Sequence, residues 1–282
     1  MKKFISLVLL LTAFQTVAVH AQEPLTADSA CCSFGQILQQ HRKVITNTQI
    51  IGFGAASILD TYLSPEEYSG GQIRYMSHTL RETEGKKWLR RILHQGVAAY
   101  AHNRADNANM MAGAYRFSYG ILRSWSLVGG SLQLRLGGMA DANVGFLYNT
   151  RNGNNPAQAK LSIDIGPVAM AAYNTNMSRM PLYVEYEICA PLCGVMFSPN
   201  YGQSYYEIFS KGNYDHNAVP TTFLSTPSMS QMLTVGLGVG KTVVKVGYLG
   251  DYRQEKVNNL KYHCYSHMFV VGITRRFSIV KL

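Results

Sequence analysis

The sequence predicts an all-β protein: an antiparallel, up-and-down transmembrane β-barrel of about ten to twelve strands, preceded by a short N-terminal amphipathic helix. The first observation is alternation, because apolar and polar residues follow one another with a period of two over long segments. The second is length, since the longest of these segments reach about 18 residues and soluble strands average about five or six. The third is that short connections alternate with longer, polar ones, as in outer-membrane barrels.

Residues 1–21 have the features of a secretory signal peptide. Lys2 and Lys3 precede an apolar stretch, and Val19-His20-Ala21 suits a small-residue cleavage site. We therefore expect an exported protein located in the cell outer membrane of a Gram-negative bacterium. The formal charge of +10 includes Lys2 and Lys3, so it falls to +8 after cleavage. This charge fits contact with anionic lipid headgroups, and nucleic acid is not an expected partner.

Residues 22–47 are expected to form a periplasmic linker that carries the short helix. Within residues 33–46, the apolar side chains of Phe34, Ile37, Leu38 and Val44 recur at helical spacing. Ser33 could cap the start of that helix. An ordered linker without a helix agrees equally well with this stretch. The barrel is expected to occupy residues 48–282.

The alternation is clearest in residues 131–149. Leu132, Leu134 and Leu136 lie on one face of this strand, whereas Arg135 and Asp141 lie on the other. The same pattern recurs at 111–121, 161–173, 182–189, 233–239, 244–251 and 262–277, and more weakly at 48–62, 70–82 and 88–102. These segments give ten strands, and a hairpin of 201–209 with 219–226 would give twelve.

The apolar face of each strand should meet lipid and the polar face should line the lumen. A soluble sandwich or lipocalin-like barrel would instead bury the apolar face. The length of the strands argues against that alternative. So do the glycines and unlike charges on the polar faces, which suit a narrow lumen better than a solvated surface.

The connections fall into two sets. The short set comprises 84–87, 124–130, 174–180 and 240–241, and the longer set 64–70, 103–109, 149–157, 253–260 and 198–229. The last of these is the longest, and it is rich in Tyr, Asn, Ser and Pro. We expect this loop to be the place where an unknown ligand would bind.

The predicted lumen face carries both signs of charge. Alternation points inward the side chains of Arg116, Arg135, Asp141, Asp164, Glu185, Glu187, Lys245 and Asp251. Buried charges persist when they are paired and hydrogen-bonded, so these residues are expected to form a polar plug. The alternative is a narrow pore, in which the same residues would bind or select a solute.

Three stretches carry a resemblance to a known family: TYLSPEEYSG (61–70), FSPNYGQSYYEIF (197–209) and SHMFVVGITRRF (266–277). The chain resembles an uncharacterised family of Bacteroidetes-type outer-membrane β-barrel proteins. The resemblance implies the fold and no activity. As an outer-membrane barrel, the protein is expected to have outer-membrane lipid or lipopolysaccharide and the barrel-insertion machinery as partners. The architecture is similar to outer-membrane phospholipase and lipid A deacylase barrels as well, at the level of fold.

A lipid hydrolase of that kind would need a serine and a histidine on the same lipid-facing wall. Two residues separated by one position share a face of a strand, yet no His-x-Ser or Ser-x-His occurs. Only a pair on neighbouring strands remains, with His78, His263 and His267 as the candidates. We therefore favour a non-enzymatic barrel with a structural, lipid-binding or partner-binding role, and keep a lipid hydrolase or acyltransferase as the alternative.

Neither a metal nor a cofactor is expected. The five cysteines do not show the paired spacing of a zinc site. The glycines between Gly236 and Thr242 suggest a phosphate loop, but Val235 stands where the first glycine of that motif belongs.

Overall fold

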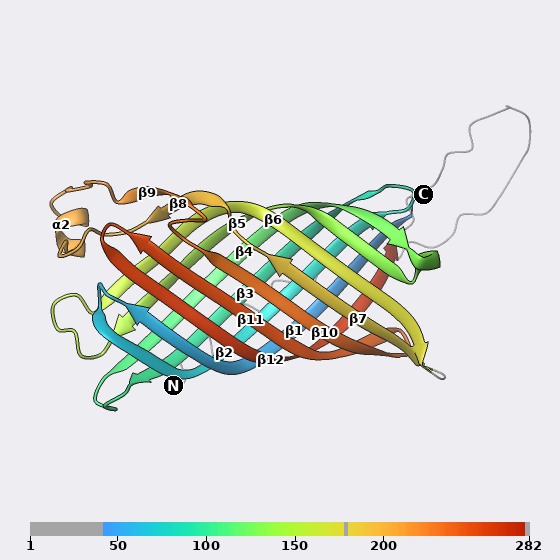
Figure 1. The fold of residues 1–282 in the computed structure, drawn as a ribbon, viewed down its shortest axis with the longest axis horizontal. Coiled ribbons are helices and arrows are strands. Elements are labelled where there is room, and N and C mark those ends of the chain that lie inside the picture. Colours follow the sequence, from blue (N-terminus) through green and yellow to red (C-terminus); the bar gives the residue numbers. More distant parts are fainter. Residues whose placement is uncertain (1–41, 178–179, 280–282) are drawn as a thin grey trace, which may run out of the picture. The chain divides into compact units, whose positions relative to one another are not determined.

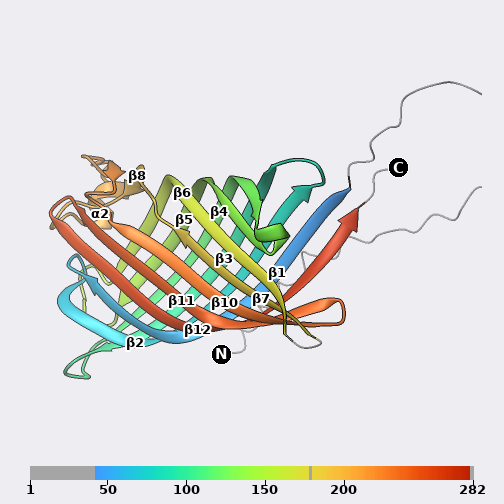
Figure 2. The same ribbon diagram turned by 45° about the vertical axis from the view of Figure 1, so that its right-hand side comes forward.

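The computed structural model describes residues 42–177 and 180–279, and most of these form one closed antiparallel barrel (Figures 1 and 2). β1 pairs with β12 along its whole length and β5 pairs with β6, so the ring has no open edge. The expected all-β antiparallel barrel is confirmed. The ten strands of the wall are β1 (Lys43–Asp60), β2 (Ser64–Thr83), β3 (Trp88–Asn103), β4 (Asn109–Leu127), β5 (Leu132–Asn149), β6 (Ala157–Met177), β7 (Met180–Cys189), β10 (Ser228–Val239), β11 (Thr242–Val257) and β12 (Leu260–Ile279).

Two further strands lie outside the ring, at the same end as the long loop. β8 (Cys193–Phe197) pairs with residues 161–165 of β6, and β9 (Ala218–Thr222) pairs with β8. Between them lies the short helix α2 (Tyr205–Phe209). The hairpin of 201–209 with 219–226, the alternative that would have given twelve strands in the wall, does not form: its first half contains a helix, and the strand in its second half pairs with β8.

Most strands are longer than the sequence pattern indicated. Residues 64–70 and 253–257 were expected to be loops, but they belong to β2 and β11. The connections there shrink to residues 61–63 and 258–259. The physical reason is that a strand continues as long as its neighbours supply hydrogen-bond partners, even where it no longer alternates between apolar and polar residues.

The two ends of the barrel differ. One end has the short connections 84–87, 128–131 and 240–241, and both β1 and β12 reach it. Residues 128–130 form a single turn of 3₁₀ helix. The other end has the connections 61–63, 104–108, 150–156, 198–217 and 258–259. No described helix is long and apolar enough to cross a membrane.

The expected signal peptide and most of the expected helix lie outside the described residues. β1 begins at Lys43, five residues before the expected start of the barrel at 48. Residues 43–46, the last four of the expected helix, are therefore strand.

The outward face is apolar over the middle of the wall. Ile51 and Phe53 on β1, Ile73 on β2 and Phe269 on β12 each expose about half of their surface or more. Phe146 on β5 covers Gly113 on β4, where an added Cβ would lie 2.6 Å from its ring. Such a surface suits hydrocarbon, so the apolar residues of 131–149 lie on the face that meets lipid.

The inward face is less polar than expected, because three apolar clusters divide the lumen. One lies at the long-loop end around Ile58, Tyr68 and Met110. The second contains Ile50, Met76, Leu249, Met268 and Val270, and the third Leu80, Leu89, Leu122, Met139, Val168 and Met170. The charged groups lie between these clusters and toward the two ends of the lumen.

Candidate functional site in the barrel lumen

All eight charged residues that the sequence pointed inward face the lumen. Arg135, Asp141, Glu187, Lys245 and Asp251 are buried, and Arg116, Asp164 and Glu185 are half-buried. The described strands add eight more inward charges, which the sequence did not single out: Asp60, Arg74, Glu82, Arg91, Lys160, Arg253, Glu255 and Arg276. Among the described residues the lumen thus holds as many acids as bases.

The uppermost group, nearest the long loops, centres on Lys160 of β6. Its Nζ lies 3.1 Å from Asp60 Oδ2 and 3.0 Å from Glu255 Oε2. The same ammonium lies 3.7 Å from the centre of the Tyr262 ring, a cation–π contact. One base therefore joins β1, β6, β11 and β12 across the lumen.

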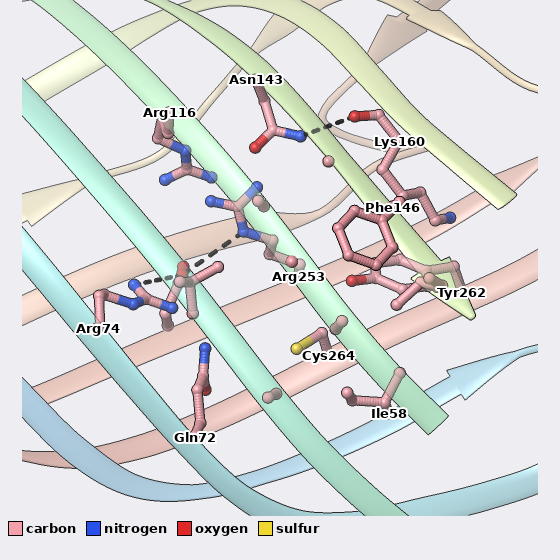
Figure 3. A pocket seen from close by; sticks show the side chains of 18 of the residues that line it. Ile58, Gln72, Arg74, Arg116, Asn143, Phe146, Lys160, Arg253, Tyr262 and Cys264 are labelled. Atoms are coloured by element: carbon pink, nitrogen blue, oxygen red, sulfur yellow. Dashed lines mark hydrogen bonds and ion pairs between the residues drawn. The ribbon is translucent and has the colours of Figure 1, made fainter. Parts of the chain in front are cut away.

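The next group surrounds a small cavity of about 70 Å³ (Figure 3). Asp251 Oδ2 lies 2.7 Å from Arg74 Nη1 and 3.5 Å from Arg253 Nε. Arg116 points into the same cavity, and Asn143 Nδ2 donates to the backbone oxygen of Lys160 at its rim. A cavity of this size has room for a few water molecules, and a sugar or peptide would not fit.

The third group is the most deeply buried. The Arg91 guanidinium donates from Nε to Glu187 Oε1 at 3.1 Å and through Nη2 to the same carboxylate, and its Nη1 donates to Ser118 Oγ at 2.9 Å. His78 Nε2 lies 3.5 Å from Glu187 Oε2. Arg91 is only 1% exposed, and this network crosses the lumen from β2, β3 and β4 to β7.

The last group lies toward the short-turn end. Lys245 Nζ contacts Glu185 Oε2 at 2.5 Å. Arg135 Nη2 lies 2.8 Å from Glu82 Oε1, and Arg276 lies 3.9 Å from the other oxygen of that carboxylate. Glu82 therefore ties β2 to β5 and β12 at the mouth of the barrel.

The catalytic candidates do not form a serine–histidine pair. His78 faces the lumen and not lipid. On the outer wall, His267 Nδ1 lies 2.6 Å from the Tyr248 hydroxyl, and His263 stacks on Tyr265 with ring centres 4.7 Å apart. In the described part of the chain, none of the three imidazoles is hydrogen-bonded to a serine or threonine.

A serine, a glutamate and a histidine do meet on the outer wall, but in an unproductive order. Ser57 Oγ donates to Glu67 Oε1, and His263 Nε2 lies 3.5 Å from the same oxygen. A serine nucleophile needs a base that takes its proton and is in turn oriented by a third group. Here the carboxylate stands between the two, so the imidazole does not reach the hydroxyl.

The long loop is held in a defined conformation above the barrel. Tyr62 donates its hydroxyl hydrogen to the Gln203 backbone oxygen at 2.9 Å, and the Tyr205 hydroxyl accepts from Ala159 N at 2.7 Å. Burial raises the pKa of both tyrosines, so both stay protonated. Ser204 and Glu207 form a capping box on α2, and the N–H and hydroxyl of Ser204 lower the pKa of Glu207.

No group of three or more His, Cys, Asp or Glu residues in the described ranges is arranged to hold a metal ion. Cys189, Cys193 and Cys264 are free thiols. Cys31 and Cys32 lie outside the described residues.

The fold and the plugged lumen define the class of protein: an outer-membrane-type β-barrel. The chain belongs to the family described as "Protein of unknown function (DUF3316)", whose model matches residues 4–282. That description names neither an activity nor a bacterial group, so the Bacteroidetes-type origin stays a prediction. A search of curated proteins finds no match.

Several solved structures are similar at low identity. The outer-membrane protease OmpT from Escherichia coli is 8% identical with a TM-score of 0.43, and 87% of this chain covers 99% of it. Neisserial surface protein A is 9% identical with a TM-score of 0.36, and the match covers 82% of this chain and 97% of that protein. An outer-membrane channel from Pseudomonas putida F1 is 8% identical with a TM-score of 0.39, and the match covers 89% of this chain and 100% of that protein. These proteins differ in role, so no activity follows from them.

Proposed function

We propose that this protein is a closed, non-conducting barrel of the outer membrane that presents its long loop, residues 198–217, as a binding surface. The rest of the expected loop, up to residue 229, contains β9 and the start of β10. The observation that carries the proposal is the filling of the lumen. Paired charges span it at several levels, and apolar clusters separate those levels. Opening a pore would strip buried charges of their partners, which costs several kcal/mol for each pair.

The loop supports the second half of the proposal. Tyr201, Tyr206, Phe209 and Tyr214 expose between 62% and 74% of their surface. Exposed aromatic groups of this kind are typical of binding surfaces, and a loop already held in place loses less entropy on binding. Tyr62, Tyr205 and the capping box supply that order.

Planar-bilayer recording of the refolded full chain tests the closed lumen, with a porin in the same bilayer as the positive control. We expect no steady conductance steps from this protein. Steady large steps would overturn the proposal and make Arg116, Arg135, Glu185 and Glu187 selectivity residues. Membrane fractionation and the gel mobility of unboiled against boiled sample test the location, and recovery as a soluble protein without a mobility shift would contradict it.

Lipid hydrolysis is the competing function, and it is tested directly. Refolded protein is incubated with phospholipid and with lipid A, with and without calcium, and the lipids are analysed by mass spectrometry. We expect unchanged acyl chains. Acyl loss that disappears in Ser57→Ala or His263→Ala would replace our proposal with a hydrolase that rearranges the Ser57–Glu67–His263 cluster.

A further inference from the structure

Charge is distributed unevenly over the outside of the barrel. At the long-loop end, the described acids Glu66, Glu67, Asp106, Glu207 and Asp215 balance the bases Arg104, Arg151, Lys211, Lys256 and Lys261. At the short-turn end, the exposed bases outside the lumen network are Arg42, Lys43, Arg81, Lys86, Lys87, Arg90, Arg123, Lys241 and Arg275, and Glu84 is the single described acid there. With the lumen neutral, the described excess of positive charge lies on this one rim.

Three of these bases converge on the outer wall of β2, β3 and β4. Arg81 lies directly opposite Arg90 in the sheet, and Arg123 lies opposite Trp88. Their inward neighbours Leu80, Leu89 and Leu122 are buried, so the three arginines point away from the lumen. None of them has an acid within 4.0 Å among the described residues, and like charges placed side by side repel one another.

Both tryptophans of the chain lie in the same place. Trp88 and Trp125 are 58% and 37% exposed, and Arg123 stacks over the Trp125 ring at 5.4 Å. Tryptophan prefers the boundary between hydrocarbon and headgroups. The wall above continues with Ile121 and other exposed apolar side chains, which suit acyl chains. The arginines lie between the two tryptophans and the apolar wall. In this arrangement the guanidinium groups suit a lipid phosphate and the apolar wall suits the acyl chains of the same lipid.

We propose that Arg81, Arg90 and Arg123, with Trp88 and Trp125, form a binding site for an anionic phospholipid of the inner leaflet. The short-turn end is the periplasmic end of such barrels, so the site faces that leaflet. The phosphate accepts hydrogen bonds from the guanidinium groups and relieves their mutual repulsion, while the acyl chains lie along β3 and β4. This site is separate from the lumen and the long loop. It rests on the membrane location in the proposed function, and it depends neither on the closed lumen nor on binding by the loop.

The two tryptophans make the site directly measurable. Refolded full chain is placed in vesicles of equal phosphatidylglycerol and phosphatidylcholine, with brominated acyl chains on one lipid and then on the other. Bromine quenches indole fluorescence on contact, so the ratio of quenching gives the relative occupancy. One basic residue near a membrane is worth about a fivefold preference for anionic lipid, and we expect at least that preference for phosphatidylglycerol.

Arg81→Gln/Arg90→Gln/Arg123→Gln should bring the preference close to parity. The matched control, Arg104→Gln/Arg151→Gln/Lys261→Gln, removes as many charges from the other end and should keep it. Gel mobility verifies that each variant is folded. If the triple variant does not fold, the single variants Arg81→Gln and Arg123→Gln replace it. Their preference for phosphatidylglycerol should lie between that of the wild type and parity. Equal quenching by both lipids in the wild type, or equal loss of preference in the control, would overturn the proposal.

Discussion

Replacing Arg91 by methionine should strongly destabilise the barrel. The methionine side chain has a similar length but lacks the guanidinium, which bonds Glu187 through two nitrogens and Ser118 through the third. After the substitution, Glu187 keeps only His78 at 3.5 Å. A carboxylate would then be buried without an adequate partner.

The size of the effect follows from burial. Removing one partner of a buried ion pair costs about 3–5 kcal/mol, mostly because the remaining charge is left uncompensated. The lost hydrogen bond to Ser118 adds about 1 kcal/mol. Arg91→Met/Glu187→Met should be much more stable than the single variant, because the uncompensated charge has gone.

The assay is equilibrium unfolding in denaturant, followed by tryptophan fluorescence and by gel mobility in parallel. Arg104→Met, in an exposed loop, serves as the control and should change the free energy of unfolding by no more than about 0.5 kcal/mol. A loss below about 1 kcal/mol for Arg91→Met would refute the reasoning. So would a double variant that is as unstable as the single one.

The glycine contacts and the capping box each give a further prediction. Gly54→Ala would place a Cβ 2.0 Å from the His267 backbone oxygen at the β1–β12 junction. It should sharply reduce the band of folded protein that an unboiled sample shows on the gel. Gly71→Ala, whose added Cβ would have nothing within 4 Å, should leave that band unchanged. The pKa of Glu207 is lowered in the folded loop. The contribution of its carboxylate to the stability of the loop is therefore present above the unfolded pKa and is lost as pH falls through the folded pKa. Hydrogen-exchange protection of residues 204–210, relative to unfolded chain, should therefore fall in acid; a loss equally steep in Glu207→Gln would contradict this.

The alternation of the sequence determined the side of the wall on which most residues lie. Residues 131–149 are strand almost throughout, and Arg135 and Asp141 are inward as their positions require. This information is local, because a strand turns successive side chains to opposite faces whatever lies beside it. The same rule excluded a Ser–His pair within one strand.

Alternation was least informative where the strand faces carry mixed residues. Arg90 and Arg91 are adjacent in the sequence, and nothing in the composition of β3 tells which one is buried. Lys160 lies one residue before the segment that alternates clearly, and Arg253 and Glu255 lie where a polar loop was expected. These missed charges complete the lumen network. The only signal for each in the sequence was its even spacing along the strand from residues that face inward.

Only the tertiary structure decided which inward charges meet. Arg91 and Glu187 are 96 positions apart, and Lys160 and Glu255 are 95 apart. β3 and β7 are not paired in the sheet, so the first of these contacts crosses the lumen. Such contacts depend on closure of the barrel, which sets its width and the stagger of its strands together. A period of two specifies a face, but the partner across the barrel is fixed only when the last strand pairs with the first.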